Sequence, residues 1–319
     1  MLTLEPSQRL ALEQPAVAVG NFDGVHRGHQ ALVAAASEAA ARHGGAVAVL
    51  TFDPHPSRVL SPQRAPSTLM TLQQKAETLE GCGVDHVIVL PFTRELAALA
   101  AEDFVQRVLV DGLAARCIVV GETFRFGRER AGDLALLRRE GVVRGFDVRG
   151  VEPVLHEGVA ISSTRIREAL ARGGVHSAQA MLGRAYFVDG RVVEGDQRGR
   201  TLGIPTANVN PSGEILPAAG VYAGWCVVED GTRWRAVINI GRRPTFEYGG
   251  DVVLEAHLLD FDGDLYGNGL RVEFEEHLRD ERRFDGVDAL KRQIHLDAER
   301  ARVLGERTEV PATGVSKTT

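Results

Sequence analysis

The sequence has few cysteines, and they are not arranged as a disulfide framework or a metal site. The 319 residues contain three, Cys82, Cys117 and Cys226, which are odd in number and form no CxxC pair. Disulfide-stapled and zinc-binding proteins carry paired, closely spaced cysteines, so we expect neither class. Isolated thiols are typical of a reducing compartment, and we expect a cytoplasmic protein.

Long apolar runs and an excess of positive charge are also missing. The start, MLTLEPSQRL, lacks the basic and apolar regions of a signal peptide. No stretch approaches the roughly 20 apolar residues of a membrane helix, so we expect no membrane association. The 37 basic and 43 acidic residues give a net charge of −6, which argues against nucleic acid as a partner but leaves small anionic ligands open. No feature indicates an obligate protein partner.

The first part of the chain alternates between strand and helix patterns, and its length leaves room for a second domain. Expected strands cover residues 16–19, 46–52, 86–92 and 117–121, and expected helices cover 30–43, 72–81 and 101–113. That order predicts a parallel sheet covered by helices. The strand runs are apolar throughout, as in strands that are buried on both faces.

After about residue 184 the pattern changes to short β-rich runs between Gly and Pro turns. The runs are YFVDGRVV, VYAGWCVV, RWRAVINI, VVLEAHLLDF and LRVEFEEHL. They predict an antiparallel barrel or sandwich. Phe284, Val287, Leu290 and Ile294 recur at spacings of three and four and predict a final amphipathic helix. We therefore expect domains over 1–184 and 185–305, and a polar, disordered tail over 306–319.

The segment GNFDGVHRGHQ follows the first expected strand, at Gly20, and leads into a helix that begins near Gly28. Parallel sheets bind ligands at the carboxyl ends of their strands, and a helix start offers unpaired N–H groups to a phosphate. His26 and His29 are three residues apart, so both can face one phosphate group there. A metal pair or two surface histidines are the alternatives. A Walker A loop is absent.

Four segments of the first half carry a family resemblance. GNFDGVHRGH resembles the (H/T)xGH region of Rossmann-like nucleotidyltransferases in their flavin adenylyltransferase form, and ISSTRIREAL (161–170) resembles that family's ISSTxIR motif. TFDPHPSRVL (51–60) and VVGETFRFGRERAG (119–132) are similar to it as well. The serines and threonine of ISST can cap a helix, which is also the simpler interpretation of that motif alone. Arg167 can clamp phosphates with its planar fork.

The second half resembles riboflavin kinases. GDQRGRTLGIPTAN (195–208) is similar to their GxxRGxxLGxPTAN signature, and INIGRRPTF and LEAHLLDFDGDLYG also match. Thr206 and Asn208 offer hard oxygen ligands on one side of an extended segment, suited to Mg²⁺ carrying ATP phosphates. Glu255 interrupts an apolar run, and a carboxylate there is expensive unless it is functional. By resemblance Glu255 is the general base for the flavin ribityl 5′-hydroxyl, whereas His257 is expected to pack or to support the site residues from behind.

The matching segments span roughly residues 15–305 in order, so the chain resembles the bifunctional bacterial riboflavin kinase/flavin adenylyltransferase family. The resemblance implies a Rossmann-like nucleotidyltransferase domain followed by an antiparallel β-barrel with a terminal helix. It implies that ATP phosphorylates riboflavin to FMN in the second half and adenylylates FMN to FAD in the first, with Mg²⁺ as cofactor. The catalytic residues that it implies are His26, His29, Arg167 and Glu255.

The resemblance also implies two binding sets. The nucleotide set is Gly20, Phe22, Asp23, Gly28, Ser162, Ser163, Thr164, Gly195, Arg198, Gly199, Gly203, Pro205 and Asn239. The flavin set is Asp53, His55, Pro56, Thr123, Phe124 and Arg279.

Two positions depart from the family pattern. The family commonly has Asp or Asn at the position of Thr123 and Asp at that of Gly174, where it associates these side chains with flavin binding. An alternative function follows: a riboflavin kinase whose first half is a weakened, altered-specificity or regulatory nucleotide- or flavin-binding module. A nucleotidyltransferase for another substrate is a third hypothesis, and the attached kinase-like half argues against it.

Overall fold

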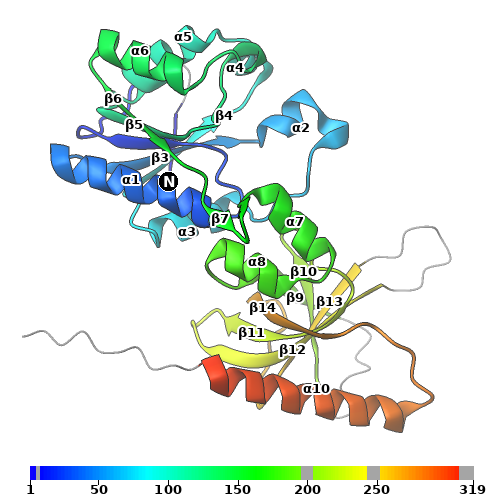
Figure 1. Ribbon diagram of the computed structural model, residues 1–319. Coiled ribbons are helices and arrows are strands. Elements are labelled where there is room, and N and C mark those ends of the chain that lie inside the picture. The colour runs from blue at the N-terminus through cyan, green and yellow to red at the C-terminus, as the bar shows by residue number, and fades with distance from the viewer. Residues whose placement is uncertain (5–7, 195–203, 243–251, 309–319) are drawn as a thin grey trace, which may run out of the picture. The chain divides into compact units, whose positions relative to one another are not determined.

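The computed structural model describes residues 1–4, 8–194, 204–242 and 252–308 (Figure 1). The chain divides into two compact units. The first comprises Met1–Arg165 with Met181–Gly183, and the second comprises Ile166–Ala180 with Arg184–Thr319. In the described ranges, no helix combines the length and the apolar character needed to span a membrane.

The first unit is built on a six-stranded parallel sheet in the order β1-β4-β3-β2-β5-β6. The strands are β1 (Leu2–Thr3), β2 (Ala16–Val19), β3 (Val47–Asp53), β4 (His86–Pro91), β5 (Cys117–Gly121) and β6 (Asp147–Val151). The predicted parallel sheet and its four central strands are confirmed. The strand order reverses between β2 and β5, so the switch point of this sheet lies at the end of β2.

Helices cover both faces of this sheet (Figure 1). One face packs against α1 (Arg27–His43) and α3 (Leu72–Glu80), and the other packs against α5 (Ala101–Phe104), the π-helix Val105–Gly112 and α6 (Leu134–Arg144). Successive strand residues enter opposite cores, as Val17 and Ala18 do, which explains why the strands are apolar throughout. The sequence predicted one helix over 101–113, but its second part is a π-helix in which Leu113 N–H bonds to Val108 O at 3.1 Å.

Short elements complete the first unit and lead out of it. They are α2 (Pro56–Leu60), the 3-10 helix Pro62–Arg64, α4 (Arg94–Ala97), the 3-10 helix Arg128–Arg130, the hairpin strands β7 (Leu155–His156) and β8 (Val159–Ala160), α7 (Ser163–Ala171) and α8 (Val175–Leu182). Helix α7 begins in the first unit and continues into the second.

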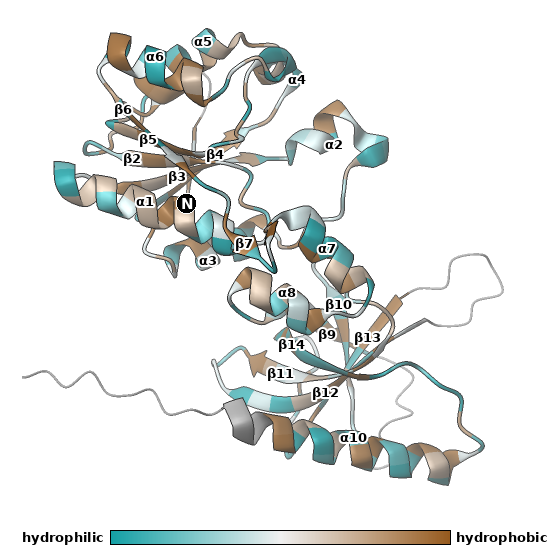
Figure 2. Ribbon diagram, in the orientation of Figure 1, coloured by the Kyte–Doolittle hydropathy of each residue, from teal (hydrophilic) through white to brown (hydrophobic). Residues whose placement is uncertain are grey.

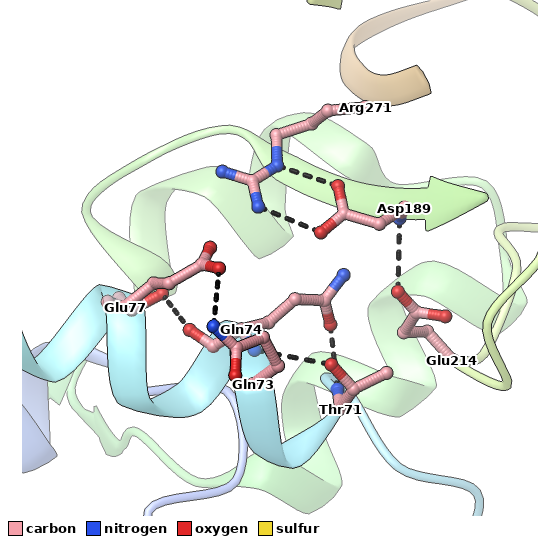
Figure 3. A network of polar contacts seen from close by, with 8 residues as sticks. Thr71, Gln73, Gln74, Glu77, Asp189, Glu214 and Arg271 are labelled. Atoms are coloured by element: carbon pink, nitrogen blue, oxygen red, sulfur yellow. Dashed lines mark hydrogen bonds and ion pairs between the residues drawn. The ribbon is translucent and has the colours of Figure 1, made fainter. Parts of the chain in front are cut away.

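The second unit is a closed antiparallel barrel in the order β10-β13-β12-β11-β14-β9, which decides between the predicted barrel and sandwich. The strands are β9 (Tyr186–Val193), β10 (Ala207–Pro211), β11 (Gly220–Val228), β12 (Arg233–Arg242), β13 (Val252–Leu258) and β14 (Gly269–Arg279). The strand patterns missed β10, whose sequence ANVNP is polar and bounded by prolines. Between β14 and β9, Arg271 forms a two-pronged ion pair with Asp189 at 2.7 and 2.8 Å (Figure 3).

Helix α10 (Val287–Thr308) covers one side of this barrel. Hydrophilic and hydrophobic residues alternate along it (Figure 2), and its apolar side packs on Val221, Val237 and Leu278. The predicted terminal helix is confirmed, although Phe284 precedes its first residue. The helix includes residues 306–308, which the sequence assigned to the tail, and 309–319 lie outside the described residues.

Candidate functional site

The turn after β2 holds its backbone in an unusual conformation. Phe22 and Val25 have φ angles of +49° and +40°, and both side chains are fully buried. Each such residue costs on the order of 1–3 kcal/mol and persists only where its surroundings hold it. Gly24 has φ +87°, a conformation that favours glycine, and a Cβ there would lie 2.8 Å from Leu69 Cδ1 and require that side chain to shift. Strain of this kind marks ligand-binding turns, and this turn lies at the switch point of the sheet.

Hydrogen bonds to three side chains and one backbone N–H, from four other parts of the first unit, fix this turn. The bonds are Thr51 Oγ1 to Asn21 O (3.0 Å), Leu69 N to Asp23 Oδ1 (3.0 Å), Gln30 Nε2 to Val25 O (2.9 Å) and Ser163 Oγ to Asp23 O (2.8 Å). The last bond joins the GNFDGVHRGH and ISST segments, which are 140 residues apart in the sequence. Since Thr51 belongs to TFDPHPSRVL, the structure brings together three of the four segments on which the adenylyltransferase resemblance depends.

His26 and His29 stack at the start of α1. Their ring centroids lie 3.7 Å apart with an interplanar angle of 15°, and the Phe22 ring is 4.9 Å from His29. His26 is the N-cap of the helix, because its Nδ1 accepts a hydrogen bond from His29 N–H at 3.3 Å. Nδ1 is thus an acceptor, so the hydrogen of the neutral ring is on Nε2. Gly28 lies in the first turn of α1 between the two histidines.

The ISST segment starts α7 as the sequence predicts. Ser162 Oγ accepts a hydrogen bond from Arg165 N–H at 3.3 Å, which is a helix cap, whereas the Ser163 hydroxyl donates to Asp23 O. Thr164 is exposed. Arg167 follows Ser163 by four residues on the same helix and belongs to the second compact unit. That Arg167 faces a phosphate together with the histidines stays a prediction.

The predicted flavin residues of the first unit follow strands β3 and β5, the neighbours of β2. Asp53 ends β3 and precedes a cis peptide bond to Pro54, and Thr123 and Phe124 come directly after β5. Since parallel strands end at a common edge, these residues share that edge with Gly20. Thr123 is exposed, whereas Phe124 is half-buried and stacks on Phe126 at 5.6 Å.

His55 has a local structural role that the sequence did not predict. It is the N-cap of α2, whose first residue is Pro56, and its Nδ1 accepts from Ser57 N–H at 3.2 Å. A proline at the first helical position is compatible with such a cap. The cap therefore engages the Nδ1 atom of His55 in local structure.

Gly174 stands at the start of α8, where its carbonyl accepts the Ala178 N–H at 3.0 Å. An aspartate at such a position can cap a helix. A Cβ at Gly174 would lie 3.2 Å from Ala169 O, so a larger residue needs a small shift of that carbonyl. The glycine therefore removes a potential helix cap as well as a polar group.

In the barrel, polar residues from three adjacent strands form one row. Asn208 of β10 pairs with Glu255 of β13, which pairs in turn with Asn239 of β12. Directly opposed residues bring their Cβ atoms to about 5 Å, and Asn239 Nδ2 donates to Glu255 Oε2 at 3.4 Å. Leu254 and Ala256 alternate with Glu255 and are buried, so Glu255 faces away from the barrel interior and is half-buried. The register thus collects three predicted site residues.

His257 holds the start of the PTAN segment. Its Nδ1 lies 2.7 Å from Pro205 O, and because a carbonyl only accepts, Nδ1 carries the hydrogen. Burial lowers the pKa of His257, an effect that the Pro205 bond partly opposes. The imidazole therefore favours the neutral form and donates to the residue that precedes Thr206. The sequence suggested a packing or supporting role for His257, and the bond to Pro205, 52 residues away, identifies a partner that no local pattern signals.

A cavity of about 550 Å³ opens beside this segment. Its lining includes Thr206, Asn208 and the loop from Phe261 to Tyr266. In that loop Asp264 Oδ1 accepts the Tyr266 N–H at 3.0 Å, which stabilises the turn. Asn208 Oδ1 is buried and has no hydrogen-bond partner in the described part of the chain. An unsatisfied amide oxygen of this kind is suited to a cation or to a ligand donor.

Arg279 ends β14 and is tied to α10. Its Nε and Nη2 lie 3.0 and 2.9 Å from Asp297 Oδ2, and Asp297 is buried. The sequence singled out Arg279 but missed Asp297, because the pair forms only when the helix packs on the barrel. Four other predicted site residues lie outside the described residues: Gly195, Arg198, Gly199 and Gly203.

Comparison with known proteins gives matches along almost the whole chain. A family model described as FAD synthetase matches residues 9–165, and one described as riboflavin kinase matches residues 182–304. A bifunctional riboflavin kinase/FMN adenylyltransferase of Pseudomonas fluorescens is 44% identical over 90% of this chain and 91% of its own length. The protein of that name from Escherichia coli K12 is 42% identical over 89% of this chain and 90% of its own.

A solved structure shares the architecture of both halves. It is that of a protein described as a macrolide-efflux protein from Streptococcus pneumoniae, with a TM-score of 0.86, 32% identity and coverage of 95% of this chain and 99% of that one. The two family models and the more similar relatives are described as riboflavin kinase and FAD-forming enzymes, not as efflux proteins. The family assignment depends on these matches.

Proposed function

Since the chain belongs to the bifunctional riboflavin kinase/FMN adenylyltransferase family, we propose that it makes FMN from riboflavin and ATP and then FAD from FMN and ATP. We assign adenylyl transfer, with release of pyrophosphate, to residues 1–184 and phosphorylation to residues 185–305. The observation that carries the proposal is the presence of two different polar clusters. One is the histidine stack after the strained turn, and the other is the row Asn208–Glu255–Asn239 on the barrel.

In the kinase half, Glu255 is the proposed general base. Its half-buried carboxylate is held by Asn239 and accepts the proton of the ribityl hydroxyl as that oxygen attacks the γ-phosphate. The His257–Pro205 bond and the pairing of β10 with β13 fix the PTAN segment relative to Glu255. Thr206, Asn208 and Glu255 are therefore oriented before the substrates bind. Arg279, held by Asp297, is the proposed flavin contact in this half.

Thr206 and Asn208 are the proposed magnesium ligands. The buried and unsatisfied Oδ1 of Asn208 fits a hard cation, and a threonine hydroxyl is a compatible ligand. Magnesium, when bound, neutralises charge on the ATP phosphates. Phosphate oxygens of the nucleotide would supply further ligands to this ion.

In the adenylyltransferase half, the attacking FMN phosphate is already anionic, so the residues need only bind and stabilise charge. The Nε2–H of His26, the imidazole of His29 and the N–H groups at the start of α1 are the proposed donors to the ATP phosphates, with Arg167 as a further cation. The edge residues Asp53, Thr123 and Phe124 are the proposed flavin contacts.

We further propose that both reactions occur in the cytoplasm without an obligate protein partner. The three cysteines are free thiols, which is typical of a reducing compartment. The net charge of −6 does not favour nucleic acid or an anionic membrane as a partner.

A two-step assay tests the function. Purified protein receives riboflavin with Mg-ATP and, separately, FMN with Mg-ATP, and the flavins are separated by chromatography. We expect FMN and FAD in the first reaction and FAD in the second, and EDTA should stop FMN formation. If neither product forms, the proposed function is wrong.

One observation favours a second candidate, a riboflavin kinase with a weakened or regulatory first half. Thr123 and Gly174 lack the polar groups common in the family, and Gly174, at the start of α8, has no side chain that could cap that helix. The same assay separates the two candidates, because FMN without FAD would support the second. The fixed turn and stacked histidines support the first.

A further inference from the structure

A buried lysine lies behind the turn that carries the adenylyltransferase histidines. Lys75 of α3 is only 8% exposed, and its Nζ donates to Thr51 Oγ1 at 3.3 Å. The Thr51 hydroxyl, itself fully buried, donates in turn to Asn21 O at 3.0 Å. The hydroxyl has one hydrogen, which it gives to Asn21, so it must accept from Lys75. The three groups form one chain of hydrogen bonds that ends on the strained turn.

The composition makes this lysine unusual. The chain has 37 basic residues, of which only Lys75, Lys291 and Lys317 are lysines, so arginine supplies nearly all positive charge. Lysine is almost never fully buried unless it is paired, and an apolar side chain would fill the same space at a lower desolvation cost. A lysine at this position therefore indicates that a compact hydrogen-bond donor is required here. Neither a guanidinium group nor an apolar side chain meets this requirement.

Carboxylates from two predicted substrate segments act on Lys75. Burial lowers its pKa, and the charges of Asp23 and Asp53 oppose that shift. Asp23 belongs to the turn after β2, which the sequence assigns to nucleotide, and Asp53 ends β3, which the sequence assigns to flavin. Lys75 thus interacts electrostatically with a carboxylate of each segment.

Helix α3 holds Lys75 firmly in place. Its first turn is a capping box: Thr71 Oγ1 accepts from Gln74 N–H at 3.2 Å, and Gln74 Oε1 accepts from Thr71 N–H at 2.7 Å (Figure 3). Lys75 N–H then bonds to Thr71 O at 3.0 Å. Such a box defines the first turn of a helix, and Lys75 immediately follows its last residue.

We propose that Lys75 is a positioning residue for adenylyl transfer, which fixes the nucleotide turn through Thr51 and ties it to the flavin segment that ends β3. This inference rests on the proposed function of the first half. Lys75 needs no contact with substrate: it sets the backbone of Asn21 and Phe22, and through them the placement of the histidines at the start of α1.

The test measures kcat and KM for FAD formation from supplied FMN in Lys75→Met, Thr51→Val and Thr51→Ser, with Lys291→Met as a matched control. We expect Lys75→Met and Thr51→Val to lower kcat for FAD formation by about 10-fold or more, the scale that follows when a buried hydrogen-bond partner is left unsatisfied. Thr51→Ser keeps the hydroxyl and should restore most of the rate. Lys291→Met should match the wild type, and all four should keep riboflavin kinase activity.

Each outcome of this test either supports or overturns the proposed role of Lys75. Wild-type rates of FAD formation in both Lys75→Met and Thr51→Val would overturn the proposal. If Lys75→Met loses both activities through misfolding, the threonine pair decides, and equal loss in Thr51→Val and Thr51→Ser would overturn it. Absence of FAD formation in the wild type would instead refute the proposed function of the first half, and the inference would fall with it.

Discussion

The two compact units position their candidate functional groups in different ways. In the sheet unit these groups follow the strand ends, on turns whose strained backbone is held by buried side chains such as Thr51 and Lys75. In the barrel they project from the middle of strands, where the register alone places Asn208, Glu255 and Asn239 side by side. A substitution in the barrel row should therefore remove one group, whereas a substitution near the turn can also move its neighbours.

Glu255→Gln should give the largest effect and separate the two units. Glutamine keeps the size and the contact with Asn239 but cannot accept the proton, so FMN formation should fall by about 100- to 10,000-fold. FAD formation from supplied FMN should be unchanged. Chromatographic initial rates measure both activities. Loss of both in a variant that still folds would show that the units do not act independently.

His29→Ala should give the converse result. Removal of one donor to developing charge commonly lowers kcat by about 100-fold, so FAD formation should fall on that scale while riboflavin kinase activity persists. Thermal unfolding of the variant controls for damage to α1, since His29 also stacks on His26. Unchanged FAD formation would exclude a phosphate role for His29.

Thr123→Asn tests whether the sheet unit is weakened at one of the two positions that depart from the family pattern. If the missing amide weakens flavin binding, its return should lower KM for FMN in FAD formation by about 2- to 10-fold, the value of one hydrogen bond. Riboflavin kinase activity serves as the internal control. An unchanged KM would mean that the Thr123 hydroxyl already suffices.

His257→Gln should give the smallest effect, in the pH dependence of stability. Because burial lowers the pKa of His257 below its ordinary value of 6.5, the unfolded chain binds a proton first as pH falls. The stability from the neutral imidazole is complete above about pH 6.5 and is lost as pH falls through the window below it. Thermal unfolding between about pH 5 and 8 should show a shallower acid decline of Tm in the variant. Parallel curves would contradict this role.

Local patterns predicted much of the fold because the strands of a parallel sheet are continuous apolar runs and barrel strands alternate. The patterns failed where the chemistry of a strand is atypical, as in β10, whose polar residues and flanking prolines resemble a loop. They also failed at short edge strands, since β1 and β6 gain their stability from their neighbours rather than from their own sequence.

Motifs identified residues that the fold then assembled, and the supporting groups gave no such signal. Nothing around Gln74-Lys75-Ala76 distinguishes Lys75 from a surface helix lysine, and Asp297 sits in an ordinary charged helix. Their roles come from burial against distant strands.

Taken alone, the amino-acid order predicted most of the strands and helices and which side chains are candidates for phosphate and proton chemistry, since these patterns depend on near neighbours along the chain. Only the tertiary structure decided that the barrel closes, that Asn208 is paired with Glu255, and that Lys75 is bonded through Thr51 to the turn after β2. The physical reason is that desolvation, register and hydrogen-bond partners arise from residues far apart in sequence, which contribute only after the chain has packed.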